Sequence, residues 1–214
     1  MKNPVNVFII ILVVSNFYLV SSSRLRSLIR IAAFQGLVLG LFPFITQAGH
    51  FSQHTLILGI GGMLLKGVGI PMLLFRALRG VEVYREAKPH VGYTMSIAIG
   101  IIITALAFWT GSLIPRSVFF PYPTVICLSM SMAAVGLFLI ISRTEVLTQV
   151  IGYLVLENAI YCFGISLSAK QSMLVEMGAL LDLLVGIFIM GVVIYHINRE
   201  FDSINTEELE ELKE

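Results

Sequence analysis

Four ionisable side chains stand inside long apolar runs of this sequence: Lys66, Glu157, Glu176 and Asp182. A charged group at the centre of a bilayer costs about 2.5–3.5 kcal/mol on insertion scales, so such residues normally face a bundle interior, a charged partner or a water-filled path. A carboxylate that alternates between charged and neutral, beside a lysine that can also release its proton, is what a proton relay requires. These four residues are the candidates for proton translocation.

Three of the four candidates lie at a common depth. Lys66, Glu157 and Asp182 each stand near the midpoint of an apolar run. Glu176 is about 9 Å from Asp182 along a helix axis at 1.5 Å per residue, and we interpret it as an access group or a residue near the headgroups. One lysine cannot neutralise every carboxylate, and a buried carboxylate without a partner takes up a proton readily. The alternative is a set of static ion pairs.

The run around Lys66, "LGIGGMLLKGVGIPMLLF", is rich in glycine and contains Pro71. Gly62 lies four residues before Lys66 and therefore on the same helical face. Pro71 has no N–H to donate to the carbonyl of Gly67, so an acceptor is left near the lysine. The run is not a phosphate-binding loop, because the required G-K-S/T ending is missing.

The histidines are weaker signals. "HFSQH" places His50 and His54 four residues apart, but no third ligand is close in the sequence, and we predict no metal site. His90 and His196 lie at predicted inner helix ends and are candidates for proton uptake, or ordinary interfacial residues. No Ser–His–Asp or Cys–His set indicates an active site.

The elements that must position these residues follow from composition. The chain has 214 residues, of which 57% are hydrophobic and 13% charged, where globular domains carry about 25% charged residues. This predicts an all-α, polytopic membrane helix bundle. A spanning helix needs roughly 20 apolar residues. We predict about seven such helices, at 5–22, 28–46, 55–75, 91–113, 123–142, 147–168 and 173–196.

The distribution of basic residues sets the predicted orientation. With the N-terminus outside, ten lysines and arginines fall in inside segments and three in outside segments. We therefore predict a multi-pass protein of the cell (inner) membrane with a cytoplasmic C-terminus. The first apolar run is long for the core of a signal peptide, and we expect it to remain as a span.

Other features are interpreted structurally. In "QGLVLG", Gly36 and Gly40 have the small-xxx-small spacing of closely packed helices. Cys127 and Cys162 lie in different apolar runs, form no C-x-x-C motif and are expected to be reduced, buried packing residues. We divide the chain into a transmembrane bundle, 1–197, and an acidic cytoplasmic tail, 198–214, which is a solvated end or a docking contact. The net charge of +1 gives no indication of nucleic-acid binding.

The last three predicted spans, 123–197, resemble the small K subunit of respiratory complex I and its relatives in multi-subunit cation/proton antiporters. That family carries a glutamate in its second span, within a pattern that resembles "IGYLVLENA", residues 151–159. Aligning the "IG" and "NA" pairs puts Leu154 at the usual glutamate position and the acid at Glu157. A shift of three residues is about 300° of helix turn, so the acid stays near the same face. In the third span, Asp182 stands four residues before Gly186, as the family glutamate does before its glycine.

The whole chain is most similar to one branch of that family, hydrogenase-4 component E, through "QVIGYLVLEN", residues 149–158, and "INREFDS", residues 197–203. The resemblance implies a non-catalytic membrane subunit of a group 4 nickel–iron hydrogenase or formate hydrogenlyase-type complex. Its partners would be antiporter-like membrane subunits, a complex I H-like membrane subunit, and a soluble hydrogenase arm at the cytoplasmic face. The nickel–iron centre and iron–sulfur clusters would belong to those partners, and none to this chain.

Two alternatives remain open at this point. The chain is a subunit of a multi-subunit cation/proton antiporter without redox chemistry, or it is a structural linker whose buried charges are static pairs. The proteins that co-purify with it would separate the first alternative from a hydrogenase. Protonation changes at the carboxyl groups would separate the second from a relay.

Overall fold

The computed structural model describes residues 4–46, 60–61, 63–79, 89–113 and 123–166, with two further helical positions at 186 and 191. This part of the chain forms helices, and short turns at residues 22–24 and 143–145 join two pairs of them. They are α1 (Pro4–Ser21), α2 (Leu25–Thr46), the π-helical turn η1 (Leu65–Gly69), α4 (Ile70–Arg79), α5 (Tyr93–Ser112), α6 (Pro123–Ser142) and α7 (Val146–Ser166).

Five of these helices, α1, α2, α5, α6 and α7, are long and apolar enough to cross a membrane. The predicted all-α membrane bundle is therefore confirmed, with spans close to the expected ranges. The third predicted span, 55–75, is described only in part, where η1 leads into α4, and α4 runs on to Arg79 with Leu74, Ala77 and Leu78 buried on one face. It is not among those five helices. The seventh predicted span, 173–196, and the tail 198–214 lie outside the described residues.

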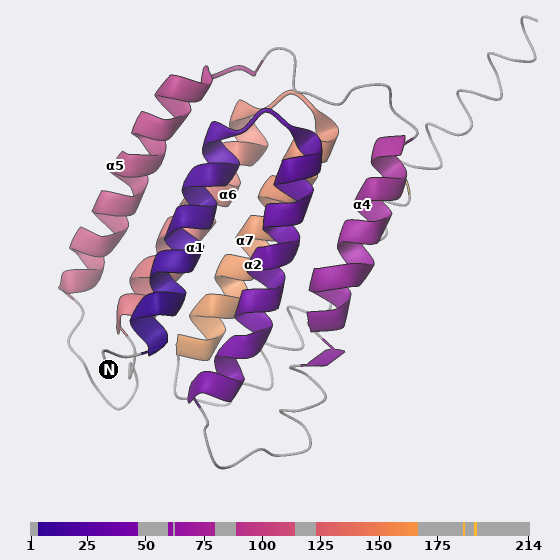
Figure 1. The fold of residues 1–214 in the computed structure, drawn as a ribbon. Helices are drawn as coiled ribbons and strands as arrows, with labels where there is room; N and C mark the ends of the chain where they lie inside the picture. The colour runs from indigo at the N-terminus through magenta and orange to yellow at the C-terminus, as the bar shows by residue number, and fades with distance from the viewer. Residues whose placement is uncertain are drawn as a thin grey trace, which may run out of the picture.

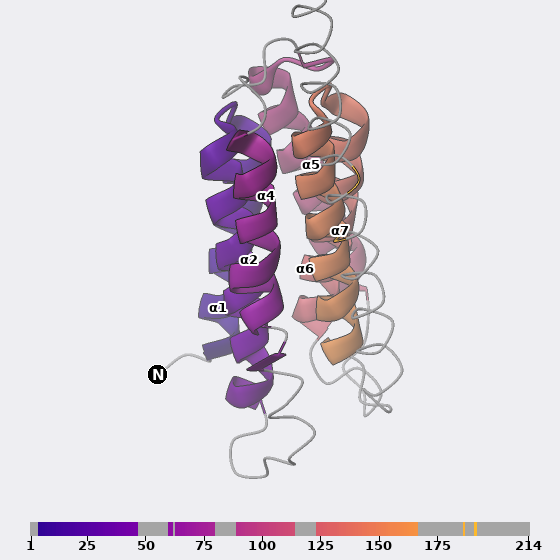
Figure 2. The ribbon, with the colours of Figure 1, turned by 90° about the vertical axis from the view of Figure 1, so that its right-hand side faces the viewer.

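The helices form two layers, which Figure 2 shows edge-on: α1, α2 and α4 in one, and α5, α6 and α7 in the other. In Figure 1, α5 lies at one edge of the bundle and α4 at the other. α6 and α7 are packed against each other most extensively, and α2 contacts α1, α7, η1 and α4. α2 is thus the central helix of its layer and brings the Lys66 segment toward α7.

A pair of glycines lets the backbones of α6 and α7 meet. A Cβ on Gly136 would lie 2.7 Å from the backbone nitrogen of Leu156 and 2.8 Å from the carbonyl oxygen of Gly152. A Cβ on Gly152 would lie 2.9 Å from the carbonyl oxygen of Gly136. Because backbone atoms cannot swing aside as a side chain can, both positions require glycine. This contact fixes the height of α7, and with it the height of Glu157.

We call the end of the bundle where α1, α4 and α6 end and α2, α5 and α7 begin the basic end. The six arginines of the described residues lie toward it: Arg24, Arg26, Arg30, Arg76, Arg79 and Arg143. The opposite end carries no charged side chain in the described part of the chain. Such an asymmetry is what the positive-inside rule expects of a cytoplasmic end.

Arg143, in the turn between α6 and α7, is buried and joins several helix ends. Its Nη2 donates a hydrogen bond of 2.6 Å to the carbonyl of Val20 at the end of α1, and its guanidinium lies 4.6 Å from the ring centroid of Tyr93 at the start of α5. Gln149 in α7 donates a 2.9 Å hydrogen bond to the carbonyl of Arg143. A charge-assisted hydrogen bond and a stacked ring hold the basic end together.

Candidate functional site

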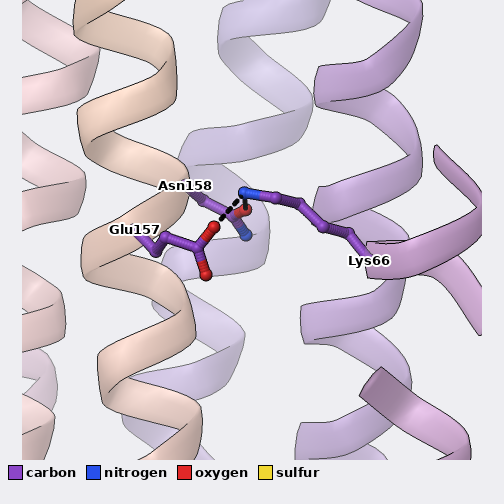
Figure 3. Close-up of polar contacts among 3 residues, drawn as sticks. All are labelled: Lys66, Glu157 and Asn158. Atoms are coloured by element: carbon purple, nitrogen blue, oxygen red, sulfur yellow. Dashed lines mark hydrogen bonds and ion pairs between the residues drawn. The ribbon is translucent and has the colours of Figure 1, made fainter. Parts of the chain in front are cut away.

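Lys66 and Glu157 form an ion pair in the interior of the bundle. The Nζ of Lys66 lies 2.6 Å from Oε1 of Glu157, and it also donates a hydrogen bond of 3.4 Å to Oδ1 of Asn158 (Figure 3). Only 1% of the Glu157 side chain is exposed, against 11% of Lys66. The ring of Tyr161, one turn further along α7, lies with its centroid 5.4 Å from the ammonium. The two charges therefore compensate each other where water is largely excluded.

Lys66 stands in η1, the π-helical turn Leu65–Gly69, which leads into Pro71. The N–H of Ile70 donates to the carbonyl of Leu65, five residues back, where an α-helix would reach four. Pro71 has no N–H, and its ring would clash with a carbonyl of a regular helix. The wider turn accommodates the proline and aims the lysine at α7. Turns of this kind are frequent at functional sites.

Small residues on α2 allow the Lys66 segment to come close. A Cβ on Gly36 would lie 2.6 Å from the Cβ of Lys66, and a Cβ on Gly40 would overlap the side chain of Met63. The close helix packing predicted from "QGLVLG" is therefore confirmed, with the Lys66 segment as the partner. Without this approach, the lysine would stand further from Glu157.

The interior of the bundle consists of two apolar clusters. The cluster toward the basic end includes Leu19, Leu28, Ala32, Leu74, Val135 and Val155. The cluster toward the opposite end includes Leu12, Leu39, Phe42, Met132, Ala159 and Cys162. Both cysteines are buried and free, as predicted. Along each of α1, α2 and α7, a few buried residues lie between the part of the helix in one cluster and the part in the other.

Buried polar residues occupy that separating stretch, which we call the polar layer: Ser15, Asn16, Gln35, Glu157 and Asn158. Gln35 of α2 donates hydrogen bonds of 2.7 Å to the Oγ of Ser15 and 2.9 Å to Oδ1 of Asn16, both on α1. Ser15 donates in turn to the carbonyl of Leu12. The ion pair is therefore one part of a polar layer between two apolar clusters.

Sequence reasoning missed three residues of the polar layer, Ser15, Asn16 and Gln35, and gave Asn158 no role. Comparing depths among charged residues alone overlooks Asn16 and Gln35, which are amide side chains well inside apolar spans. Asn158 belongs to the "NA" pair that carries the resemblance to the K subunit. Extending the comparison to amides would have singled out Asn16, Gln35 and Asn158, but not Ser15.

Of the predicted relay residues, the structure brings Lys66 and Glu157 together. Asp182, Glu176 and His196 lie outside the described residues, as do His50 and His54. His90 is exposed at the basic end, where its backbone N–H donates a 2.9 Å hydrogen bond to the carbonyl of Ser142. Glu157 is eleven residues into α7, so His90 is roughly 16 Å away along the helix axis and does not contact the ion pair.

Comparison with known proteins places this site in a family context. Residues 124–214 match the family of NADH-ubiquinone/plastoquinone oxidoreductase chain 4L. The uncharacterized protein Rv0085 of Mycobacterium tuberculosis is 30% identical over 209 residues, which cover 95% of this chain and 93% of that protein. The chain belongs to the same family as Rv0085. No solved structure matches it.

The match to chain 4L confirms the resemblance of the last part of the chain to the complex I K subunit. It includes α6 and α7, and thus Glu157 and Asn158, whereas Lys66 precedes it. Leu154, which the resemblance to the K subunit would put at that family's usual glutamate position, lines the same small cavity as Glu157. In this chain, the site combines an acid from the part that matches chain 4L with a base from the part that precedes it.

Proposed function

We propose that this chain is a membrane subunit of a group 4 nickel–iron hydrogenase or formate hydrogenlyase-type complex, and that its Lys66–Glu157 pair takes part in proton translocation. The observation that carries the proposal is the pair itself. A carboxylate in the helix that matches chain 4L is held at 2.6 Å by a lysine from outside that match. Burial of an ionisable pair in a membrane bundle is typical of a proton pathway.

The proposed role follows from charge balance. While the ammonium of Lys66 lies beside it, the carboxylate of Glu157 is stabilised as an anion. If the ammonium withdraws or releases its proton, the buried carboxylate is left without compensation and takes up a proton.

The partners follow from the exposed surfaces and from the family. Antiporter-like membrane subunits and a complex I H-like membrane subunit would contact the apolar edges of the bundle, where α4 and α5 expose Met72, Ile102 and Trp109. The basic end would face the cytoplasm and the soluble arm. Asp182 and Glu176, of the last predicted span, would continue the relay, and His90 and His196 would serve proton uptake.

The role of the pair is tested in membrane vesicles that contain the assembled complex. Glu157→Gln removes the exchangeable proton at nearly constant volume, and we expect proton transport to fall roughly tenfold or more. Lys66→Met should lower it as well. Glu145→Gln is the matched control, because Glu145 lies in the α6–α7 turn at the basic end. Transport unchanged in both Glu157→Gln and Lys66→Met would contradict the relay.

The identity of the complex is tested separately. The full chain, purified with its partners in mild detergent, should bring nickel, iron and proteins that bind iron–sulfur clusters. Recovery of antiporter-like membrane proteins without nickel would overturn the hydrogenase assignment and favour an antiporter. That result would leave the transport experiment, and the role of Glu157, untouched.

A further inference from the structure

Electron-rich groups of α7 other than the carboxylate also face the ammonium of Lys66. Oδ1 of Asn158 lies 3.4 Å from Nζ, and the centroid of the Tyr161 ring lies 5.4 Å from it. Figure 3 shows the amide of Asn158 and the carboxylate of Glu157 turned toward the same nitrogen. An amide oxygen accepts a hydrogen bond from an ammonium, and an aromatic ring face attracts a cation within about 6 Å of its centroid. The ammonium therefore has attractive neighbours that do not change their charge when Glu157 does.

The two polar distances leave room for the tip of the lysine to move. N–H···O bonds usually measure about 2.7–3.2 Å, and those between charged groups are the shorter ones. The 2.6 Å contact of Lys66 with Glu157 is short, whereas its 3.4 Å bond to Asn158 is long. The ammonium thus rests against the carboxylate. A movement of the flexible lysine tip that lengthens the first contact can shorten the second.

The bundle holds Asn158 and Tyr161 in place. Asn158 is only 3% exposed, and Tyr161 packs against the apolar cluster that contains Phe42 and Cys162. Polar groups that are already fixed need no reorganisation when a charge moves onto them. The other residues that line the small cavity at the pair, from α2, α4 and α7, carry no titratable group. Among the described residues, Glu157 and Tyr161 are therefore the titratable groups that face Lys66.

We propose that Asn158 and Tyr161 form a second resting position for the ammonium of Lys66, which it occupies when Glu157 takes up a proton. The two are positioning residues, because they act through the lysine and do not exchange a proton themselves. They keep Lys66 charged while the proton is exchanged at Glu157. Without them, an ammonium beside a neutral carboxyl in a dry interior would release its proton. The part of this position in transport rests on the proposed function, but its hold on the ammonium is measured without transport.

The nitrogen NMR signal of the lysine Nζ differs between an ammonium and a neutral amine, and it tests the proposal on the full chain in lipid vesicles. Glu157→Gln represents the protonated acid at nearly constant volume, and Lys66→Met identifies the signal of Lys66. Asn158→Leu or Asn16→Leu is then added to Glu157→Gln. Asn16→Leu is the matched control, because Asn16 is a buried amide of the same polar layer that accepts its hydrogen bond from Gln35.

In Glu157→Gln, Lys66 should remain an ammonium at neutral pH. Adding Asn158→Leu should weaken its proton binding about tenfold, which moves the loss of the ammonium signal about one pH unit lower. Adding Asn16→Leu should leave the titration of Lys66 unchanged. A neutral amine in Glu157→Gln alone would overturn the proposal. So would a titration that Asn158→Leu does not shift, or that Asn16→Leu shifts equally.

Tyr161 is tested separately, and because it is only half-buried, its replacement does not depend on the tolerance of position 158. In the Glu157→Gln background, Tyr161→Phe keeps the ring face and should leave the titration unchanged, whereas Tyr161→Leu should weaken proton binding by Lys66. Equal titrations in the two variants would contradict the role of the ring.

The outcome separates this proposal from the proposed function. A shifted titration in Asn158→Leu together with full proton transport in Glu157→Gln would leave the second resting position standing and refute the relay. An unshifted titration together with lost transport in Glu157→Gln would refute the resting position alone.

Discussion

The Nζ of Lys66 and the Oε1 of Glu157 lie 2.6 Å apart in the interior of the helix bundle. Two backbone features make this distance possible. Gly36 lets the lysine segment approach α2, and the π-turn before Pro71 aims the lysine at α7. The acid comes from the part of the chain that matches chain 4L, and the base from the part that precedes it.

The pair predicts a non-additive effect on stability. Lys66→Met and Glu157→Gln should each lower the melting temperature, because each leaves one buried charge uncompensated. The double variant should lose less than the sum, with a coupling free energy of about 1–3 kcal/mol. Unfolding can be followed through Trp109, the single tryptophan of the chain. Additive losses would show that the two side chains do not stabilise each other.

Gly36→Ala should weaken the ion pair without changing either charge. The new Cβ would lie 2.6 Å from the Cβ of Lys66, so η1 would have to move away from α2. We expect a lower melting temperature and reduced proton transport in the same variant. Gly61→Ala is the matched control, because a Cβ there would meet no atom within 4 Å. Equal behaviour of the two variants would contradict a close contact at Gly36.

Gln35→Leu should destabilise the bundle by about 1–3 kcal/mol, because Asn16 loses its hydrogen-bond donor in a buried setting. Adding Asn16→Leu should recover part of that loss, since α1 and α2 then carry no unpaired amide at this contact. Chemical unfolding in detergent measures both variants. A double variant that is less stable than Gln35→Leu would contradict this account. It would show that Asn16 finds another hydrogen-bond partner in Gln35→Leu, or that the leucine at position 16 packs poorly.

Gly152→Ala should separate α6 from α7, because its Cβ would lie 2.9 Å from the carbonyl oxygen of Gly136. Overpacking of this kind costs about 1–3 kcal/mol. Gly92→Ala, at the start of α5, has no atom within 4 Å of the new Cβ and a φ of −58°, and should be neutral. Melting temperatures of the purified variants provide the comparison, and a neutral Gly152→Ala would show that the helices adjust at that height.

Much of this architecture could be predicted from the sequence, because hydrophobic length and helical rise are regular. The five confirmed spans follow from apolar runs of the right length. The similar distance of Lys66 and Glu157 to the ends of their spans indicated that the two could meet. The prediction could not say which carboxylate would meet the lysine, since that depends on how each helix is rotated. Rotation is set by contacts such as Gly36 with Lys66, between residues far apart in the sequence.

The π-helical turn before Pro71 and the hydrogen bonds between α1 and α2 could not be predicted from the hydrophobic pattern of the sequence. Pro71 indicated a break in helical hydrogen bonding, but a kink and a π-turn relieve the same clash, and only packing against α2 decides between them. Ser15, Asn16 and Gln35 form hydrogen bonds between helices. Serine, asparagine and glutamine side chains inside a span can bond to their own helix or to any neighbouring helix, so their presence alone did not predict that they would share one layer with Glu157.

The most direct measurement is the infrared difference spectrum of the purified protein in lipid as the buffer is exchanged between alkaline and acidic pH. If Glu157 exchanges a proton, the wild type should show a protonated-carboxyl band that Glu157→Gln lacks, and Lys66→Met should shift the pH at which this band appears. Bands from Asp182 and Glu176 would persist in Glu157→Gln. A spectrum that is identical in the wild type and Glu157→Gln would mean that Glu157 keeps its charge, and would contradict the relay.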